Sequence, residues 1–319
     1  MNHTIRKKLA QGKRRIERRL ARIDNTGCER PMFTAAKIHY EIADRTRAIG
    51  AGGIGAMHLV AKKLGLVEAI DRELQLLKVH LPYHESDHVL NIAYNLLAGG
   101  ACLEHLELRR NDEVYLDSLG TRRIPDPTTA GDFCRRFSAR DINALQEVFN
   151  ETRLKVWQQQ GDEFFEEAII EADGTMVETT GECKQGMDIN YKGQWGYHPL
   201  MISLANTGEP LYIVNRSGNR PSHEGAAEYL DKSITICRRA GFLKIKLRGD
   251  TDFTQTAYLD DWDDQGDVTF VFGIDAMPNL YKKAENLPKT AWKRLRRRSR
   301  YEVKTTPRAR PTNVKEQVV

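Results

Sequence analysis

The chain has 319 residues and a formal net charge of +5, and its apolar fraction of 40% is enough to bury the cores of two domains. No apolar run approaches the length of a membrane span, and no apolar segment of a signal peptide follows the basic N-terminus. The five cysteines form no CxxC pair, which argues against a disulfide scaffold or a zinc knuckle. These features predict a soluble cytoplasmic protein with reduced thiols.

Basic residues are concentrated at both ends of the chain. Residues 1–50 are predicted to form a basic arm, and a second basic run covers residues 293–310. Residues 250–267 hold seven aspartates and no lysine or arginine. Basic ends around an acidic pocket suit an enzyme that binds a polyanion with the help of metal ions, although solvated helix faces give the same pattern. The cations selected as contacts to such a partner are Arg14, Arg15, Arg18, Arg296, Arg297 and Arg298.

Residues 51–160 have apolar side chains at every third or fourth position, which predicts a helical domain. Residues 126–149 in this domain resemble a helix-turn-helix. Thr129 is expected to cap a short helix, and Ser138 is expected to cap the next helix in a capping box with Asp141. Two interpretations stay open here, a DNA-facing unit and a helical hairpin that packs into a core.

Two further patterns in this domain are weak signals of a ligand site. "GAGGIG", residues 50–55, satisfies the GxGxxG spacing, but no strand is predicted before it, so a loop that enters a helix is favoured over a dinucleotide site. His80, His84 and His88 recur at every fourth position, as in a metal-binding stripe. Pro82 breaks a helix through them, and Ser86 is expected to cap the next helix, which favours a polar loop.

Residues 161–319 are predicted to form a domain with a mixed sheet. The apolar run that ends at Asp173 is the first strand, and "YHPLMISLA" and "LYIVNRS" form a hairpin across the turn "NTGEP". A helix from Pro221–Ser222 to Gly241, a strand over 243–249, a helix near 253–265 and a strand at "DVTFVFGI" follow. This order, an antiparallel start and then alternating strands and helices, favours an α/β or α+β class.

Asp173 and Asp250 each end a predicted strand of this domain, the first and the fourth. If those strands are neighbours, both carboxylates lie at one edge of the sheet, where their repulsion is relieved by a divalent cation. Mg²⁺ takes a few carboxylates together with water and phosphate oxygens, which suits phosphodiester chemistry. The alternative is that both aspartates merely cap turns or helices.

Two other groups in this domain are candidate DNA contacts. "YKGQWGYH" places Lys192 and Trp195 close together, and an aromatic ring beside a cation can stack on an unpaired base. Aromatic side chains that start a strand and enter the core are the favoured alternative. Arg216 and Arg220 lie in the loop after the third strand, where they can reach a phosphate, or simply belong to a solvated turn.

Several long stretches resemble the DDE-domain transposases of bacterial insertion sequences, the group 1 class. They include "EADGTMVETT", "GYHPLMISLANTGEPLYIVNRSGNRPSHEGAAEYLD" and "RGDTDFTQTAYLDDW", and the resemblance covers roughly residues 35–319. It implies a ribonuclease-H-like domain in which Asp173 and Asp250 are catalytic and hold Mg²⁺ or Mn²⁺. It also implies DNA as the partner, cleavage of transposon ends followed by strand transfer, and a nucleoid-associated protein; the pairing of DNA ends favours a homodimer.

The third acid of that family, a glutamate, has no match in this sequence. In the family it follows a strand-rich insertion, and "YEVKTTPRARPTNVKEQVV" resembles the beginning of that insertion. This predicts an incomplete sheet domain and a truncated transposase that is inactive alone. Glu285 is the substitute candidate if the insertion is absent. Two alternatives follow, a non-catalytic DNA-binding fragment that inhibits transposition and a related metal-dependent nuclease.

Overall fold

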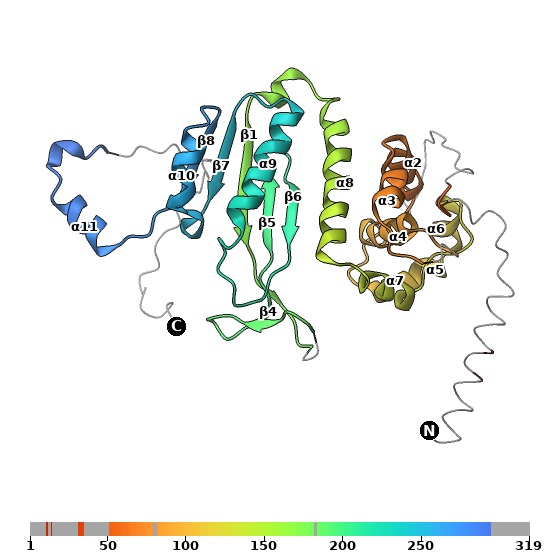
Figure 1. Cartoon of the computed structure of the whole chain (residues 1–319). Helices are drawn as coiled ribbons and strands as arrows, with labels where there is room; N and C mark the ends of the chain where they lie inside the picture. Colours follow the sequence, from red (N-terminus) through yellow and green to blue (C-terminus); the bar gives the residue numbers. More distant parts are fainter. Residues whose placement is uncertain are drawn as a thin grey trace, which may run out of the picture. The chain divides into compact units, whose positions relative to one another are not determined.

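The computed structural model describes residues 11, 14, 31–34, 51–78, 82–181 and 184–294. The chain divides into two compact units, Met1–Gly273 and Ile274–Val319. Within the first unit, two separate hydrophobic cores are present, one among helices and one around a sheet (Figure 1). The helix Ala139–Trp157 contributes to both cores, with Val148 in the helical core and Leu154 and Trp157 in the sheet core. The boundary predicted near residue 160 stays a prediction.

The helical part contains short helices around one core, as the spacing of its apolar residues predicts. Ile70, Leu74, Tyr115 and Leu119 are fully buried at its centre. Helix α3 packs against both α4 and α8. The α-helices are α2 (Ile54–Lys63), α3 (Leu66–Glu73), α4 (Glu85–Leu97), α5 (Leu106–Arg110), α6 (Glu113–Ser118), α7 (Pro127–Cys134) and α8 (Ala139–Trp157), and a 3₁₀ turn covers η1 (Leu103–His105).

Helices α7 and α8 form the predicted helix-turn-helix stretch. The Ser138–Asp141 capping box at the start of α8 is confirmed. The cap of α7 is Asp126, which accepts from the Thr129 backbone N–H at 2.9 Å, so the prediction that Thr129 caps this helix is wrong. Phe133 of α7 is buried and its ring stacks on His88 with the ring centroids 4.4 Å apart. This contact favours the hairpin packed into a core, and a DNA-facing role stays a prediction.

The weak ligand patterns of the helical part have structural explanations. Residues 51–53 form a turn that leads into α2, which agrees with the loop expected for "GAGGIG". Helix α4 begins after its N-cap, His84, and not after Ser86 as predicted. His88 is buried against Phe133, while His80 lies outside the described residues. The predicted polar loop therefore ends earlier, and one member of the histidine stripe belongs to the core.

The sheet part contains a five-stranded mixed sheet in the order β6-β5-β1-β7-β8. Strand β1 pairs antiparallel with β5 and parallel with β7, and β7 pairs parallel with β8. The predicted mixed sheet is confirmed, including the contact between its first and fourth long strands. The strands are β1 (Ala168–Gly174), β5 (Leu200–Leu204), β6 (Glu209–Val214), β7 (Ile245–Gly249) and β8 (Val268–Phe272).

Helices α9 (Ala226–Ala240) and α10 (Thr256–Asp263) accompany this sheet, and the 3₁₀ turns η2 (Asp162–Phe165) and η3 (Thr251–Phe253) precede β1 and follow β7. Helix α9 packs across β1, β5, β6 and β7 (Figure 1). Its apolar side chains enter the core together with alternate residues of those strands. It begins at Ala226, later than predicted, because Pro221–Glu224 form a turn. It ends at Gly241 in the left-handed conformation, as predicted.

Three short strands form a second sheet that the sequence did not predict. Strand β4 (Trp195–Tyr197) lies between β2 (Val177–Glu178) and β3 (Asp188–Ile189). In the second unit, α11 (Pro278–Glu285) and the 3₁₀ turn η4 (Lys289–Ala291) are described. Among the described residues, no helix is long and apolar enough to cross a membrane.

Candidate functional site

Asp173 and Asp250 lie at the same edge of the sheet, on neighbouring strands. Asp173 is the second-last residue of β1, and Asp250 directly follows β7. The parallel register pairs Ala168 with Ile245 and continues to Glu171 with Arg248. Two residues further along each strand (171 + 2 and 248 + 2), the same register brings Asp173 beside Asp250. Both side chains are exposed.

Each aspartate is adjacent to a glycine whose missing side chain leaves room for a neighbour. A Cβ on Gly174 would lie 2.9 Å from Cε1 of His198. A Cβ on Gly249 would lie 2.9 Å from the Cβ of Phe253, a side chain that is 1% exposed. Because contacts this short do not occur between real carbon atoms, both positions require glycine unless the neighbour moves. The local sequences "ADG" and "RGD" are therefore part of how the sheet edge is built.

The carboxylates are oriented by hydrogen bonds from the backbone. The Gly174 N–H donates to Oδ1 of Asp173 at 2.8 Å, and the Asp252 N–H donates to Oδ1 of Asp250 at 2.9 Å. The other oxygen of each carboxylate has no hydrogen-bond partner among the residues that the structure describes. Two exposed, neighbouring carboxylates, each with one oxygen available, form the kind of donor set that a hard divalent cation prefers. Asp250 also caps η3, which agrees with the turn-capping interpretation for this residue.

Two ion pairs lie on the same face of the sheet as the aspartates. Arg248 donates from Nε to Oε1 of Glu171 at 2.6 Å, and Lys246 lies 2.7 Å from Oε1 of Glu167. Because side chains alternate along a strand, Glu171 and Arg248 share the face of Asp173 and Asp250. Glu171 and Arg248 were not among the predicted site residues, although both stand two residues before an aspartate in the strand pattern. Glu171, whose charge is neutralised by Arg248, thus lies on the same face as Asp173 and two residues before it.

Arg216 and Arg220 are both engaged with the protein itself. The Nε of Arg216 donates to the carbonyl of His198 at 3.0 Å, and its Nη1 donates to the carbonyls of Ser222 and Glu224 at 3.0 and 2.6 Å. Burial lowers the pKa of the Arg216 guanidinium. Arg220 is exposed and forms an ion pair with Glu224 at 3.1 Å. These contacts give Arg216 a role in holding the loop before α9, and the DNA contacts of both arginines stay predictions.

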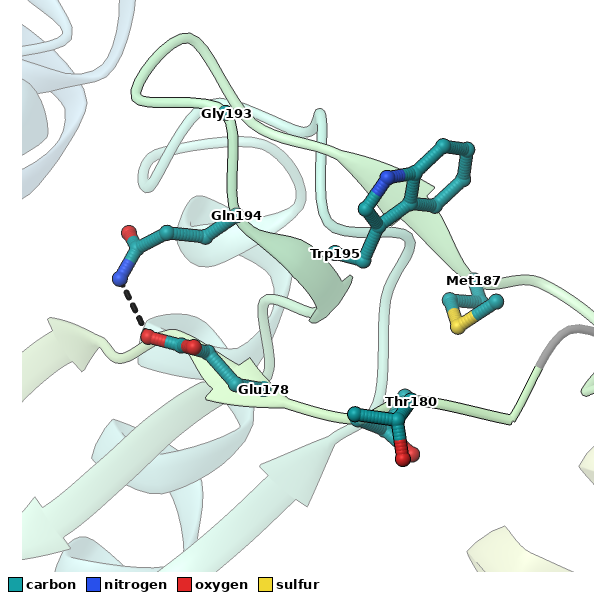
Figure 2. A pocket seen from close by; sticks show the side chains of 7 residues that line it. Glu178, Thr180, Met187, Gly193, Gln194 and Trp195 are labelled. Carbon is teal, nitrogen blue, oxygen red and sulfur yellow. Dashed lines mark hydrogen bonds between the residues drawn. The ribbon is translucent and has the colours of Figure 1, made fainter.

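Lys192 and Trp195 belong to the small sheet and its hairpin turn. Lys192 is exposed in the turn between β3 and β4, and the Trp195 side chain on β4 is 52% exposed. The interpretation of these aromatics as core residues is therefore wrong for Trp195. Trp195 lines a surface hollow of about 940 Å³, shown in Figure 2 with the bonded side chains of Glu178 and Gln194. Figure 2 shows Met187 on the side of Trp195.

The remaining predicted site residues are placed as follows. Glu285 is exposed at the end of α11, in the second unit. Arg14 is exposed in a helical position, whereas Arg15, Arg18, Arg296, Arg297 and Arg298 lie outside the described residues. Among the described residues, no group of three or more histidine, cysteine, aspartate or glutamate side chains is placed to hold a metal ion. Asp173 and Asp250 are thus two candidate metal ligands without a third among the described residues.

Comparison with known proteins identifies the family. Residues 44–313 match the family described as transposase DDE domain group 1. The chain belongs to this DDE transposase family. A solved structure of the piggyBac transposase synaptic complex with hairpin DNA is 12% identical, with a TM-score of 0.32, and the match covers 83% of this chain and 50% of that chain. The DDE chain therefore spans half the length of that protein, and no curated protein matches it.

The family assignment confirms the resemblance found in the sequence. It also agrees with the predicted fold class, since the chain combines helices with a mixed sheet. In this transposase the strand-end aspartates lie in the part of the chain that the family covers, and so do the small sheet and α11.

Proposed function

We propose that this transposase cuts DNA strands at the ends of a bacterial insertion sequence and joins them to a target, with Asp173 and Asp250 as its catalytic metal ligands. The observation that supports the proposal is the parallel register of β1 and β7, which runs from Ala168 with Ile245 to Glu171 with Arg248. Continued by two residues on each strand, it places Asp173 beside Asp250. At the usual strand spacing of about 5 Å, their carboxylates are close enough to share one cation. Mg²⁺, or Mn²⁺ in its place, fits an all-oxygen donor set of this kind.

The aspartates in this proposal act through their available oxygens. The backbone N–H groups of Gly174 and Asp252 hold one oxygen of each carboxylate, so the other oxygen is presented to the solvent side of the sheet edge. Two like charges at this spacing repel each other, and a bound cation offsets that repulsion. When bound, divalent cations activate the attacking oxygen and stabilise the leaving oxygen of a phosphodiester. No covalent bond between protein and DNA is part of this mechanism.

DNA binding in the proposal is distributed over the chain. The helical part and the basic runs around Arg14 and Arg296 would contact the backbone of the transposon end, where each neutralised phosphate contributes a salt-dependent term. Pairing of two ends favours a homodimer on DNA. For a protein that binds DNA in this way, we propose a cytoplasmic location in association with the nucleoid.

The test is a strand-nicking assay on a duplex that carries the terminal sequence of the element encoding this chain. We expect cleavage that depends on Mg²⁺ or Mn²⁺ and that falls to background in Asp173→Asn and in Asp250→Asn. The matched control is Asp252→Asn, because Asp252 is an exposed neighbour that contributes only its backbone N–H to Asp250. Cleavage that survives both substitutions at the strand ends would refute the catalytic assignment.

A second candidate function is a non-catalytic DNA-binding protein that occupies transposon ends and inhibits the active enzyme. It is favoured by one observation, the lack of a third described metal ligand beside the pair. Glu285→Gln separates the remaining option, a metal-dependent nuclease in which Glu285 completes the site. Loss of cleavage in this variant supports that nuclease, and tight end binding by a wild-type chain that never cuts supports the inhibitor.

A further inference from the structure

The hairpin that joins β3 and β4 presents aromatic side chains to solvent. Tyr191 is 93% exposed at its turn, with Nζ of Lys192 5.4 Å from the ring centroid. Trp195 follows on β4 and is half exposed. Large aromatic rings bury much surface when they contact a partner, so their exposure together in a small hydrogen-bonded hairpin suggests an external contact.

The turn itself is held rigidly by hydrogen bonds. Oδ1 of Asn190 accepts from the N–H groups of Lys192 and Gln194 at 2.9 and 3.0 Å, and the Gly193 N–H donates to the Asn190 carbonyl at 3.0 Å. Gly193 has a positive φ of 81°, which favours glycine at this position. The aromatic side chains are therefore presented in a fixed arrangement before any partner binds.

The small sheet is also anchored to the loop that follows β6. Gly196 and Gly218 allow this contact, since a Cβ on Gly218 would lie 2.6 Å from the Gly196 carbonyl oxygen. Nδ2 of Asn219 donates to Oδ2 of Asp188 at 2.6 Å. Tyr197 pairs with Ser217 in an isolated bridge. The sheet is thus tied to the body of the domain and is not a loose arm.

The hollow beside Trp195 combines an apolar wall with a polar edge. Met187 and Trp195 line it together with Glu178 and Gln194, whose side chains are joined by a hydrogen bond (Figure 2). The Oε1 of Gln194 also accepts from Nδ2 of Asn190 at 2.9 Å, so this amide is fixed. The second carboxylate oxygen of Glu178 has no hydrogen-bond partner in the described part of the chain. It is an acceptor available to a donor on a ligand.

The charges around the hollow distinguish its centre from its rim. Glu178 places a carboxylate in the lining, and a carboxylate repels phosphate. Lys184 bonds to the hydroxyl of Thr179, another lining residue, and Lys192 is next to Gly193 in the turn. The centre therefore suits a neutral ring with N–H donors, and the rim suits the phosphates on either side of that ring.

The hollow lies close to the strand-end aspartates along the chain. Strand β2 begins soon after β1, and Glu178 is five residues beyond Asp173 (178 − 173). Five extended residues span at most about 17 Å. This corresponds to roughly five nucleotides of one strand at about 3.4 Å each. A nucleotide held here would belong to the same DNA segment as a phosphate at the sheet edge.

We propose that the hollow binds an unpaired nucleotide of single-stranded DNA, with its base against Trp195, its N–H groups toward Glu178, and its phosphates toward Lys184 and Lys192. Aromatic platforms flanked by cations are how proteins hold unpaired bases without reading a long sequence. The choice of DNA over another ring-bearing ligand rests on the proposed function. The site itself rests on the contacts of the small sheet.

The experiment measures binding of the full chain to fluorescent oligonucleotides by anisotropy, without divalent cations. The ligands are a short single strand, the same strand with one abasic position at a time, and the corresponding duplex. We expect Trp195→Ala to weaken single-strand binding about ten-fold or more, and Trp195→Phe to retain most of it, because a base stacks on either aromatic ring. Trp292→Ala is the matched control, since Trp292 is also exposed but lies in the second unit.

Several results would overturn the proposal. Equal weakening of single-strand and duplex binding would show a backbone contact instead of a stacked base. Abasic oligonucleotides that bind wild-type protein as well as intact ones would exclude stacking without any substitution in the protein. Tighter binding of an RNA strand of the same sequence would refute the DNA assignment. The anisotropy measurement needs neither cleavage nor a divalent cation, whereas the nicking assay on Asp173→Asn tests the catalytic pair, so an inactive catalytic pair and an absent base site give different results.

Discussion

Carboxylates at the start of α4 and at the sheet edge differ in burial and in the number of backbone hydrogen bonds that they accept. Glu85 and Asp87, at the start of α4, are fully buried. Oε1 of Glu85 accepts the N–H groups of Leu76 and Leu77, both at 3.0 Å, and Asp87 also accepts two backbone N–H groups. Asp173 and Asp250 are exposed, and each accepts a single backbone N–H.

The difference shows which carboxylates are structural. A buried acid that bonds several backbone donors connects segments of the chain, and its removal leaves those donors without partners. An exposed acid with one available oxygen contributes little to the fold and is accessible to a ligand. Burial raises the pKa of Asp87 to about 6, so a strongly shifted pKa marks a structural cap here, although such shifts are often taken as signs of a functional site.

The largest expected effect contrasts the two groups by stability. Glu85→Ala leaves the N–H groups of Leu76 and Leu77 unsatisfied in a buried site, and we expect it to lower the free energy of unfolding by about 4 kcal/mol. Asp173→Ala should change it by less than about 0.5 kcal/mol, as for other exposed positions. Chemical denaturation followed by circular dichroism measures both. A larger loss for Asp173→Ala than for Glu85→Ala would contradict the division into structural and available acids.

The next effect concerns how stability depends on pH at the start of α4. Burial raises the pKa of Asp87 to about 6, so the folded state favours the protonated carboxyl group. Protonated Asp87 therefore adds to the free energy of unfolding at low pH, and this stabilisation is lost as the pH rises from about 4 to 6. Burial and nearby Arg136 lower the pKa of His88 to about 4, so the folded state favours the neutral imidazole. Its stabilisation of the folded state is present above about pH 6.5 and is lost as the pH falls to about 4. Each effect has a size of about 3 kcal/mol, and the two oppose each other.

Two substitutions separate these opposing contributions. Asp87→Asn removes the stabilisation that is lost with rising pH, so the free energy of unfolding of this variant should rise between pH 4 and 6.5. His88→Phe removes the stabilisation that grows with rising pH, so the free energy of unfolding of this variant should fall across the same pH range. The measurement is the denaturation midpoint at several pH values, with wild type expected to vary least. Identical pH profiles for both variants would show that neither group titrates as its burial requires.

Much of the sheet edge was accessible from the sequence because it depends on strand order and alternation. Asp173 and Asp250 follow apolar alternating stretches, and an order that places the first and fourth long strands together brings the two residues to one edge. Ser138 and Asp141 were equally predictable, since a capping box is a local pattern. These features are set by near neighbours or by a topology with few alternatives.

The features that the sequence did not predict depend on contacts between distant segments. Strands β2, β3 and β4 are two or three residues long, too short for an alternating pattern to stand out. For Trp195, a candidate DNA contact, the sequence favours a core position as the alternative because an aromatic at a strand start usually packs there. Only the pairing of β4 reveals that it lines a hollow. His84 caps α4 although histidine is a rare cap, because Asp87 completes its box.

The smallest expected effect tests an acid that lies between the two groups. Glu171 is on the same face as Asp173 but is bound by Arg248, and both side chains are partly exposed. Because such a pair contributes less than about 1 kcal/mol, Arg248→Met should leave the free energy of unfolding almost unchanged. It removes a positive charge beside the aspartates, so a divalent cation should bind a few-fold more tightly, as measured by Mn²⁺ titration. Glu171→Gln, which removes a negative charge at the same place, should weaken Mn²⁺ binding. If both variants shift the affinity in the same direction, the charge of this pair does not act on the strand-end aspartates.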